Sequence, residues 1–256
     1  MRISSLFRLA YAPALAALLL GCALEDGEQD LFANIESNPR PYFELFESSA
    51  GKYAFRFADE KHDTLLDSKW YESRVGALGG VVSVLDNGGL AQRYRVAEDP
   101  SGGYAIELVA RNGVVVGEST LYANPEAAER GIEELTFAIA DYLEHKHQRT
   151  GARFEVYEDE IGRFFFEIYA GDDSLLLASQ PYSSEASALN GAFSARDNGA
   201  DADRYRVIEA AHGGYYLELR AQNGRTLATS AIVSDRGDAE ASRGALRELL
   251  PVLPIL

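Results

Sequence analysis

The chain repeats itself, and this repetition limits the possible folds more than any other feature. Residues 204–230 contain RYRV, GGY, EL, AQNG and a final serine, and residues 93–119 contain nearly the same letters. Two weaker copies complete the set, so that equivalent unit starts fall at four positions: Phe43, Tyr94, Phe154 and Tyr205. The first and third units are 111 residues apart without an insertion, as are the second and fourth. One small building block, copied four times, therefore accounts for residues 43–253.

Each unit is predicted to contain three strands. Alternating apolar residues mark a first strand, a glycine-containing turn follows, and a second strand places Tyr53, Phe55 and Phe57 or their counterparts on a buried face. The third strand is followed in every unit by a serine: Ser68, Ser119, Ser179 and Ser230. Because no histidine recurs beside these serines, we interpret their hydroxyls as closing a turn rather than as nucleophiles.

The turn between the second and third strands has a strong signal in two units. Asn112-Gly113 and Asn223-Gly224 predict two-residue hairpins of type I′, which require positive φ at both residues. The first unit has Lys61-His62 at this place and the third has Asp172-Asp173. These two departures leave the geometry of the first and third hairpins open.

A helix is predicted to close each unit. Asn124 and Pro125 provide a cap and a first helical residue in the second unit, and Ser184 caps the helix of the third. One place inside three of the helices holds a glycine: Gly80, Gly131 and Gly191. Because a glycine inside a helix costs about 1 kcal/mol relative to alanine, its recurrence predicts a close approach of helix and sheet.

These elements predict an α+β fold. A single unit of about 50 residues is marginal as an independent domain, and it would leave a sheet edge open. We therefore expect two tandem modules, residues 41–148 and 149–256. Each module would be a pair of β-β-β-α repeats that share one antiparallel sheet, with both helices packed on one face.

The first 21 residues have the composition of a secretory signal peptide. Arg2 and Arg8 accompany an apolar run at residues 9–20, which is shorter than the roughly 20 residues needed to cross a membrane. The run ends in Leu19-Leu20-Gly21-Cys22, which resembles the bacterial lipobox, whose cysteine is lipidated. An ordinary signal peptide with an incidental cysteine is the alternative.

A lipobox implies attachment to a membrane through a lipid on Cys22. Ala23 follows the cysteine, and by the same resemblance it favours sorting to the outer membrane of a bacterial cell envelope. Residues 22–40 are acidic and contain few apolar side chains, so we expect a disordered tether there. If Cys22 carries a lipid, the membrane is the first expected partner of the protein.

The acidity of the chain limits its other partners. The formal net charge is −16, which repels phosphate backbones and therefore argues against nucleic acid as a ligand. The single cysteine excludes an intramolecular disulfide and a Cys-rich zinc site. His145 and His147 are the nearest pair of imidazoles, but two residues apart on a helix they point in different directions. We therefore expect no metal and no cofactor.

Five outward-facing residues are candidates for contact with a partner: Tyr169, Tyr216, Glu107, Glu167 and Glu218. A glycosidase would need two carboxylates about 5 to 10 Å apart. Arginines on adjacent strands, such as Arg95 and Arg206, instead favour simple cross-strand charge pairs for the glutamates. The two tyrosines would either contact a partner or pack beneath the neighbouring module.

The repeat resembles a known family. Residues 213–224, with Ser230, and residues 182–191 are similar to the YegP-like family of bacterial proteins of uncharacterised function. The resemblance covers nearly all of residues 42–253. It implies β-β-β-α-β units that combine into a single sheet, with a C-terminal strand exchanged between units. No catalytic residues are established for this family, so none can be carried over.

Two classes of function remain open at this point. The first is a non-catalytic envelope lipoprotein that binds a protein or an envelope polymer, or that serves only as a spacer. The second is an envelope glycan or peptidoglycan hydrolase that uses paired carboxylates. Repetition without any recurring chemical constellation favours the first, and the sequence does not indicate an oligomeric state.

Overall fold

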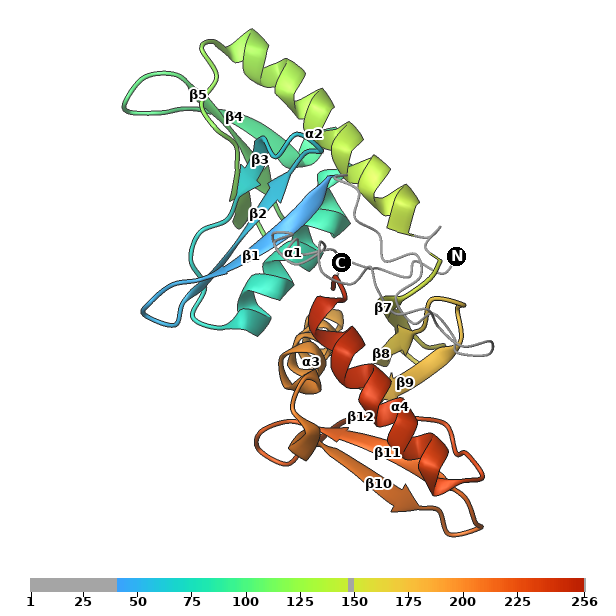
Figure 1. Ribbon diagram of the computed structural model, residues 1–256. Coiled ribbons are helices and arrows are strands. Elements are labelled where there is room, and N and C mark those ends of the chain that lie inside the picture. Colours follow the sequence, from blue (N-terminus) through green and yellow to red (C-terminus); the bar gives the residue numbers. More distant parts are fainter. Residues whose placement is uncertain (1–40, 147–149, 256) are drawn as a thin grey trace.

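The computed structural model describes residues 41–146 and 150–255, and it contains two modules of the same architecture (Figure 1). We call residues 41–146 module 1 and residues 150–255 module 2. The elements of module 1 are β1 (Tyr42–Glu47), β2 (Tyr53–Ala58), β3 (Thr64–Asp67), α1 (Arg74–Gly88), η1 (Ala91–Arg93), β4 (Tyr94–Glu98), β5 (Tyr104–Val109), β6 (Val115–Glu118) and α2 (Pro125–Lys146). The elements of module 2 are β7 (Arg153–Glu158), β8 (Phe164–Tyr169), β9 (Leu175–Ser179), α3 (Glu185–Gly199), η2 (Ala202–Arg204), β10 (Tyr205–Glu209), β11 (Tyr215–Arg220), β12 (Thr226–Thr229), α4 (Arg236–Leu249) and η3 (Leu250–Val252).

Each module has one six-stranded antiparallel sheet, formed by three strands from each of its two repeats. The first sheet has the order β1-β2-β3-β6-β5-β4, and the second has the order β10-β11-β12-β9-β8-β7. The repeats join at the centre, where β3 pairs with β6 and β9 pairs with β12. The predicted α+β fold, with paired repeats sharing a sheet and helices on one face, is therefore confirmed.

The C-terminal strand exchange implied by the resemblance is not seen among the described strands. Each sheet consists of strands from its own module. After α4 the chain instead forms η3, and Leu253 and Ile255 are 1% and 0% exposed. Pro251 and Pro254 explain this path, because proline cannot continue a helix. Leu253 is the repeat counterpart of Tyr142, whose ring packs edge-on against Phe43 in module 1.

The recurring serines have the structural role that the sequence predicts. Each hydroxyl accepts a hydrogen bond from a backbone N–H of the second strand, at 2.8 Å for Ser68 and 2.9 Å for the other three. Each also donates to the carbonyl of the residue that follows it. The hydroxyl thus fixes the point at which the third strand leaves the sheet for the helix, and it takes part in no nucleophile–base pair.

The hairpins between the second and third strands are present, but the predicted type I′ geometry is wrong. In all four repeats a backbone N–H in the turn donates to the carbonyl three residues earlier, and the register shifts near the end of the second strand, just before the turn. This is a type I turn with a bulge, which needs positive φ at one residue only. Gly113 and Gly224 have φ of 81° and 80°, and their preceding asparagines are not in this region. His62 and Asp173 adopt the same conformation, with φ of 68° and 65°.

The helix glycines allow a tyrosine to lie directly beneath the helix. A Cβ at Gly131 would collide with the Tyr122 hydroxyl and lie 2.8 Å from Ile106 Cδ1. The same collision would occur at Gly80 with Tyr71 and at Gly191 with Tyr182. These tyrosines follow the third strand, and each one bridges to the start of the second strand. The predicted close approach is therefore confirmed, and its partner is this ring. The fourth repeat has Val233 in place of the tyrosine and Ser242 in place of the glycine.

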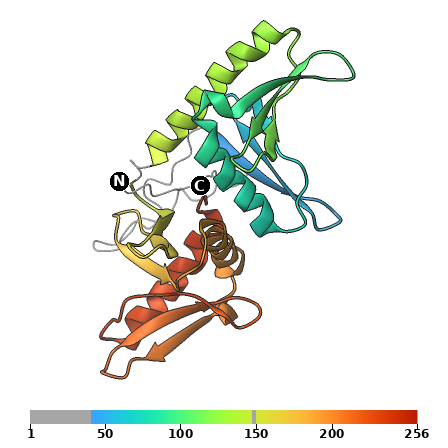
Figure 2. The same ribbon diagram turned by 180° about the vertical axis from the view of Figure 1, so that it is seen from behind.

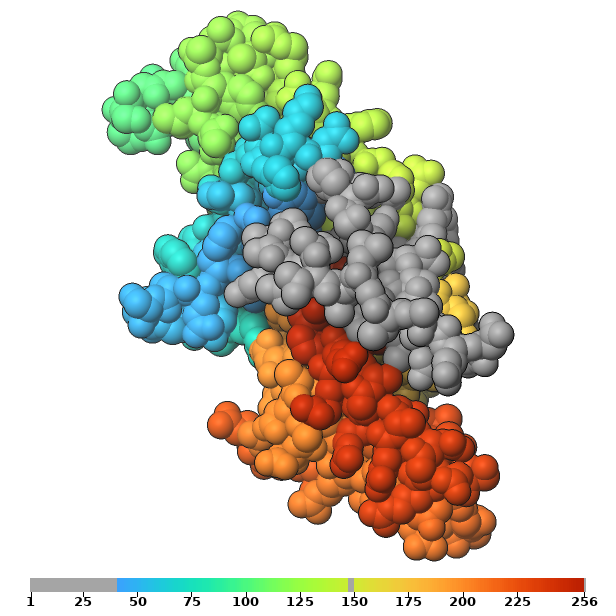
Figure 3. Space-filling view, viewed as in Figure 1, coloured from blue at the N-terminus to red at the C-terminus, as the bar shows by residue number. Residues whose placement is uncertain are grey.

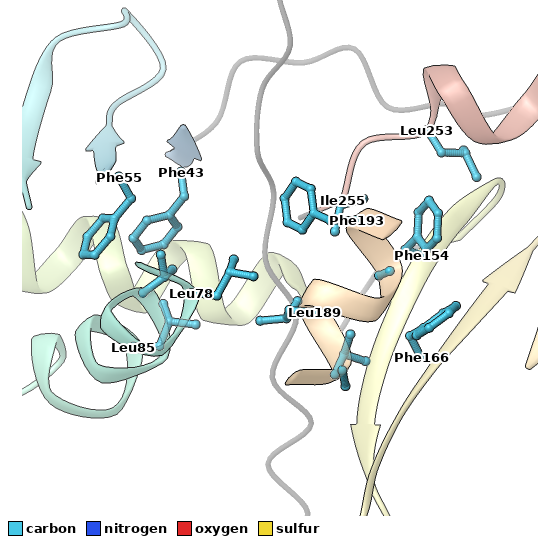
Figure 4. Close-up of a cluster of buried hydrophobic side chains, with 14 of the residues drawn as sticks. Phe43, Phe55, Leu78, Leu85, Phe154, Phe166, Leu189, Phe193, Leu253 and Ile255 are labelled. Atoms are coloured by element: carbon cyan, nitrogen blue, oxygen red, sulfur yellow. The ribbon is translucent and has the colours of Figure 1, made fainter. Parts of the chain in front are cut away.

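The two modules dock through α1 and α3, which lie next to each other in both views (Figures 1 and 2). Arg74 of α1 donates to Asn190 Oδ1 at 2.8 Å and to Asp197 Oδ2 at 2.7 Å. Its guanidinium also lies 5.4 Å from the centre of the Phe193 ring. Leu78 and Leu189 lie side by side between the core phenylalanines of the two sheets (Figure 4). The layers therefore run sheet, helix, helix, sheet.

Composition explains why these two helices form the junction. Both α1 and α3 bury apolar residues on more than one side, which is typical of a helix covered on both faces. The other two helices, α2 and α4, carry a charged face that meets water. In the space-filling view, module 1 forms one end of the molecule and module 2 the other (Figure 3). None of the described helices combines the length and the apolar character that a membrane span requires.

Adding a methyl group at Gly131 should destabilise the protein because of Tyr122. We expect Gly131→Ala to lower the free energy of unfolding by about 1–3 kcal/mol, since overpacking outweighs the gain in helix propensity. In a Tyr122→Val background the same change should cost much less, giving a coupling of about 1 kcal/mol or more in a double-mutant cycle. Urea denaturation measures both values. Gly79→Ala is the control, because nothing lies within 4 Å of its Cβ position. Equal effects of Gly131→Ala with and without the ring would contradict this account.

The bulged turns predict a purely conformational penalty at Gly113. We expect Gly113→Ala to destabilise the protein by about 1–2 kcal/mol, because an L-residue there must adopt the left-handed region. Apart from the glycine and its two chain neighbours, no atom lies within 4 Å of the added Cβ, so contact with the rest of the protein contributes nothing. Gly89 has φ of −74° and is equally open, and Gly89→Ala should be neutral or slightly stabilising. Thermal unfolding of both variants tests this, and similar shifts in Tm at the two sites would refute it.

Candidate functional site

The structure brings four of the five candidate contact residues onto one surface. Glu167 and Tyr169 lie on β8, and Tyr216 and Glu218 lie on β11. All four side chains are on the face of the second sheet that is turned away from α3 and α4. Glu107 lies on β5 of the first sheet, on the corresponding face of the other module. Because the modules dock through their helices, neither tyrosine packs beneath the neighbouring module.

We call this surface of module 2 the outer face, and its large side chains occur as cross-strand pairs. Tyr157 faces Phe165 in the register, and their rings are stacked with centroids 5.3 Å apart. Ile208 faces Tyr216. Arg153 faces Tyr169, with its guanidinium 4.3 Å from the ring centre. The residues of these pairs are half-buried, because each packs along its neighbour rather than into a core.

Module 1 has alanine at several places where the outer face has large side chains, although Tyr157 and Arg153 correspond to the large Phe46 and Tyr42. Four equivalent positions differ in this way: Ala54 and Phe165, Ala58 and Tyr169, Ala97 and Ile208, Ala105 and Tyr216. The central row also differs, since Asp67 and Glu118 of module 1 correspond to Ala178 and Thr229 of module 2. Module 1 folds into the same sheet without these side chains, so the sheet itself does not require them.

The carboxylates of the outer face are held by local partners. Glu218 lies 2.6 Å from Arg220 and also accepts a hydrogen bond from Thr226. Burial acts to raise its pKa, but the hydrogen bonds from Thr226 and Arg220 leave the pKa of Glu218 below its usual value. Glu155 pairs with Arg153 at 2.7 Å. Glu218 therefore remains ionised near neutral pH, and an arginine fixes each of the two carboxylates in place.

Tyr169, on β8, makes the remaining polar contact of the outer face. Its hydroxyl donates to Glu167 at 2.5 Å. Burial, followed by this hydrogen bond and the negative charge of Glu167, raises the pKa of Tyr169. The phenol therefore stays protonated at any physiological pH. The cross-strand charge pairing predicted for the glutamates holds for Glu107 with Arg95. It does not hold for Glu167, whose opposite residue in the register is Glu155.

The candidate glutamates do not converge as a glycosidase pair would. Glu167 and Glu218 are separated by β9 and β12, which places their strands about 14 Å apart at the usual strand spacing. Glu107 belongs to the other sheet. Hydrolysis of a glycosidic bond needs two carboxylates about 5 to 10 Å apart around the bond. These three residues therefore cannot act together on one bond.

The other sequence-predicted groups are placed as follows. His145 lies in the last turn of α2, and its ring contacts the backbone oxygen of Asp141 at 2.9 Å. His147, the lipidation candidate Cys22 and the tether at residues 22–40 lie outside the described residues. Within residues 41–146 and 150–255, no cluster of three or more His, Asp or Glu side chains is arranged to hold a metal ion.

Sequence reasoning missed part of the outer face. Tyr157, Phe165 and Ile208 were not singled out, because an outward aromatic residue on a strand is unremarkable by itself. The signal that would have found Phe165 and Ile208 is the comparison of outward positions between the two modules, where the alanines of module 1 are replaced by larger residues, whereas Tyr157 corresponds to Phe46 and gives no such signal. The half-burial of Tyr169 and Tyr216 also depends on neighbours that only the register reveals.

The chain matches the profile of a family described as "Domain of unknown function (DUF1508)" at residues 48–94, 99–136 and 159–205, which together exceed half of its length. UPF0339 protein YegP of Escherichia coli (strain K12) is 32% identical over 91 residues, which is 36% of this chain and 83% of that protein. UPF0339 protein PA0329 of Pseudomonas aeruginosa is 31% identical over 99 residues, or 39% of this chain and 90% of that protein. These relatives thus correspond in length to one module.

Two solved structures are also similar to part of the chain. The solution NMR structure of YegP from E. coli, described as a protein of unknown function, has 25% identity, covers 41% of this chain and 90% of its own, and has a TM-score of 0.38. That of UPF0339 protein SO3888 from Shewanella oneidensis has 23% identity, covers 40% and 87%, and has a TM-score of 0.38. With three repeats matched by the family profile and with these relatives at hand, the chain belongs to the DUF1508 (UPF0339, YegP-like) family, whose function is unknown.

Proposed function

We propose that this protein is a non-catalytic, lipid-anchored protein of the bacterial envelope that binds an envelope protein or polymer through the outer face of module 2. The observation that carries the binding role is the internal comparison of the modules. Four outward positions that are alanine in module 1 hold Phe165, Tyr169, Ile208 and Tyr216 in module 2. Module 1 shows that a sheet of this type folds without large side chains there, which leaves contact with a partner as their role.

The anchoring part of the proposal is supported by the sequence alone. The basic start, the short apolar run and the sole cysteine at position 22 are together typical of a lipoprotein signal. Lipid on Cys22, followed by a tether of some 18 residues, would place the folded modules up to roughly 60 Å from the membrane. Ala23 favours the outer membrane as the site of attachment.

The role as a hydrolase receives no support from the geometry. Glu155 and Glu167 face each other in the register, but Arg153 and the Tyr169 hydroxyl hold them, and Glu218 is held by Arg220. Lowered pKa values, as at Glu218, also disfavour the protonated carboxyl group that a general acid requires. A binding surface with fixed polar groups fits these observations better.

Returning the outer face to the residues of module 1 should remove binding without unfolding the protein. We expect the variant Phe165→Ala, Tyr169→Ala, Ile208→Ala, Tyr216→Ala to lose at least tenfold in retention on isolated envelopes of the host. Each change removes a cross-strand contact of about 0.2–1 kcal/mol, so the sheet should persist. Retention is measured by sedimentation of envelope with the purified full-length chain, and circular dichroism confirms the fold.

A matched control removes four large exposed apolar side chains elsewhere: Trp70, Leu121, Phe137 and Ile232, whose exposed fractions are 53%, 48%, 74% and 61%. Their replacement by alanine should leave retention unchanged. If the control variant loses retention as strongly as the outer-face variant, the effect is a general loss of hydrophobic surface. The proposal that binding is localised on the second sheet would then be wrong.

A further inference from the structure

We propose that the ligand of the outer face is a neutral glycan chain, an inference that rests on the proposed binding function and makes it more specific. The arrangement of small and large residues on the face provides the first argument. Phe165 and Tyr169 line one side on β8, and Tyr216 lines the other side on β11. The two strands between them present Ala178 and Thr229 in the row between Glu167 and Glu218, and the exposed Leu175 opposite Tyr169.

This arrangement suits one extended polymer. Phe165 and Tyr169 on β8 and Tyr216 on β11 lie on either side of the two central strands, with about 14 Å between β8 and β11 at the usual spacing. The rings pair with side chains of the outer strands β7 and β10, and Ala178 and Thr229 leave only short side chains between Glu167 and Glu218, which suits one extended chain better than a flat protein surface. In module 1 the same row carries Asp67 and Glu118, so a ligand there would meet two adjacent carboxylates.

Charge balance on the face indicates a neutral ligand. Glu155 is 2.7 Å from Arg153, and Glu218 is 2.6 Å from Arg220. Arg206 stands opposite Glu218 in the register, and with Glu167 on β8 the outward strand positions hold three arginines and three glutamates. A polyanion or a polycation would have to separate these pairs to gain contacts of its own. A neutral ligand can leave the pairs in place and still bond to their oxygen and nitrogen atoms.

The chemistry of the side chains matches a chain of sugar rings. A pyranose ring presents C–H groups on its faces and hydroxyl groups around its rim. Aromatic rings provide apolar surface for the first, and ionised carboxylates and guanidinium groups provide strong hydrogen bonds for the second. Glu218 and Glu167 are both held in fixed orientations, by Arg220 and by the Tyr169 hydroxyl respectively. An extended peptide would instead pair with the edge of a sheet, where backbone N–H and C=O groups are available.

The experiment measures binding of defined oligosaccharides to the full-length chain by titration calorimetry. The probes are the neutral hexamers of N-acetylglucosamine and of β-1,4-linked glucose, with hexagalacturonate as the anionic comparison. We expect at least one neutral hexamer to bind, and the anionic hexamer to bind at least tenfold more weakly. The variant Phe165→Ala, Tyr169→Ala, Ile208→Ala, Tyr216→Ala should weaken binding of the neutral hexamer at least tenfold.

A second variant keeps every ring and changes only the central row. Ala178→Asp with Thr229→Glu installs the acids of module 1, and it should also weaken the neutral hexamer at least tenfold. The control with alanine at 70, 121, 137 and 232 should bind as the unaltered chain does.

The outcomes separate this inference from the proposed function. If neither neutral hexamer binds at millimolar concentration while envelope retention still depends on the outer face, the ligand is not a neutral glycan but the binding role stands. The conclusion is the same if the unaltered chain recovers a protein from envelopes, the outer-face variant does not, and no hexamer binds. If retention is insensitive to the outer face and no hexamer binds, both proposals fail. Hexamer binding that survives both variants overturns the assignment to this face.

Discussion

The rest of the structure depends on one constraint, which is the close packing of each helix against its sheet. A tyrosine that bridges back to the second strand lies beneath the helix, and a glycine at the crossing leaves room for its hydroxyl. Any side chain there would lift the helix away from the core. The fourth repeat supports this argument, since it has lost the tyrosine and the glycine together, at Val233 and Ser242. The two positions therefore behave as one contact rather than as two independent preferences.

The same unit produces two kinds of helix, and this difference determines how the modules are arranged. Val82 of α1 and Phe193 of α3 are equivalent, and Phe193 is buried beneath Arg74 and α1. Their counterparts on α2 and α4 are Glu133 and Gly244, which are exposed. The modules consequently meet through the first helix of each, which places α1 and α3 inside the molecule while α2 and α4 keep one face in water. The uncovered surfaces of the two sheets are then directed away from one another, so each module offers its own face to a partner.

Much of this fold could be predicted from the sequence, because each position of the repeat occurs in four copies that can be compared. The strands, the caps at Asn124 and Ser184, and the role of the serines all follow from local patterns. The hairpin type could not be predicted, because Asn-Gly is compatible with more than one turn and the register shift decides between them. The docking of α1 on α3 and the grouping of Tyr169 with Tyr216 depend on contacts between distant residues. Of the candidate site, the sequence indicates single outward residues but not the face that they form.

Duplication within one chain also allows structural residues to be separated from functional ones. A residue that recurs in every copy, such as the serine after the third strand, is explained by the needs of the unit itself. A solvent-facing residue that differs between copies has no such explanation, because the other copy folds without it. Phe165 and Tyr216 belong to this second class, since their counterparts Ala54 and Ala105 occupy the same sheet positions in module 1. Module 1 thus serves as an internal reference for module 2, and the positions at which they differ on the outer face are those where a ligand is expected to act.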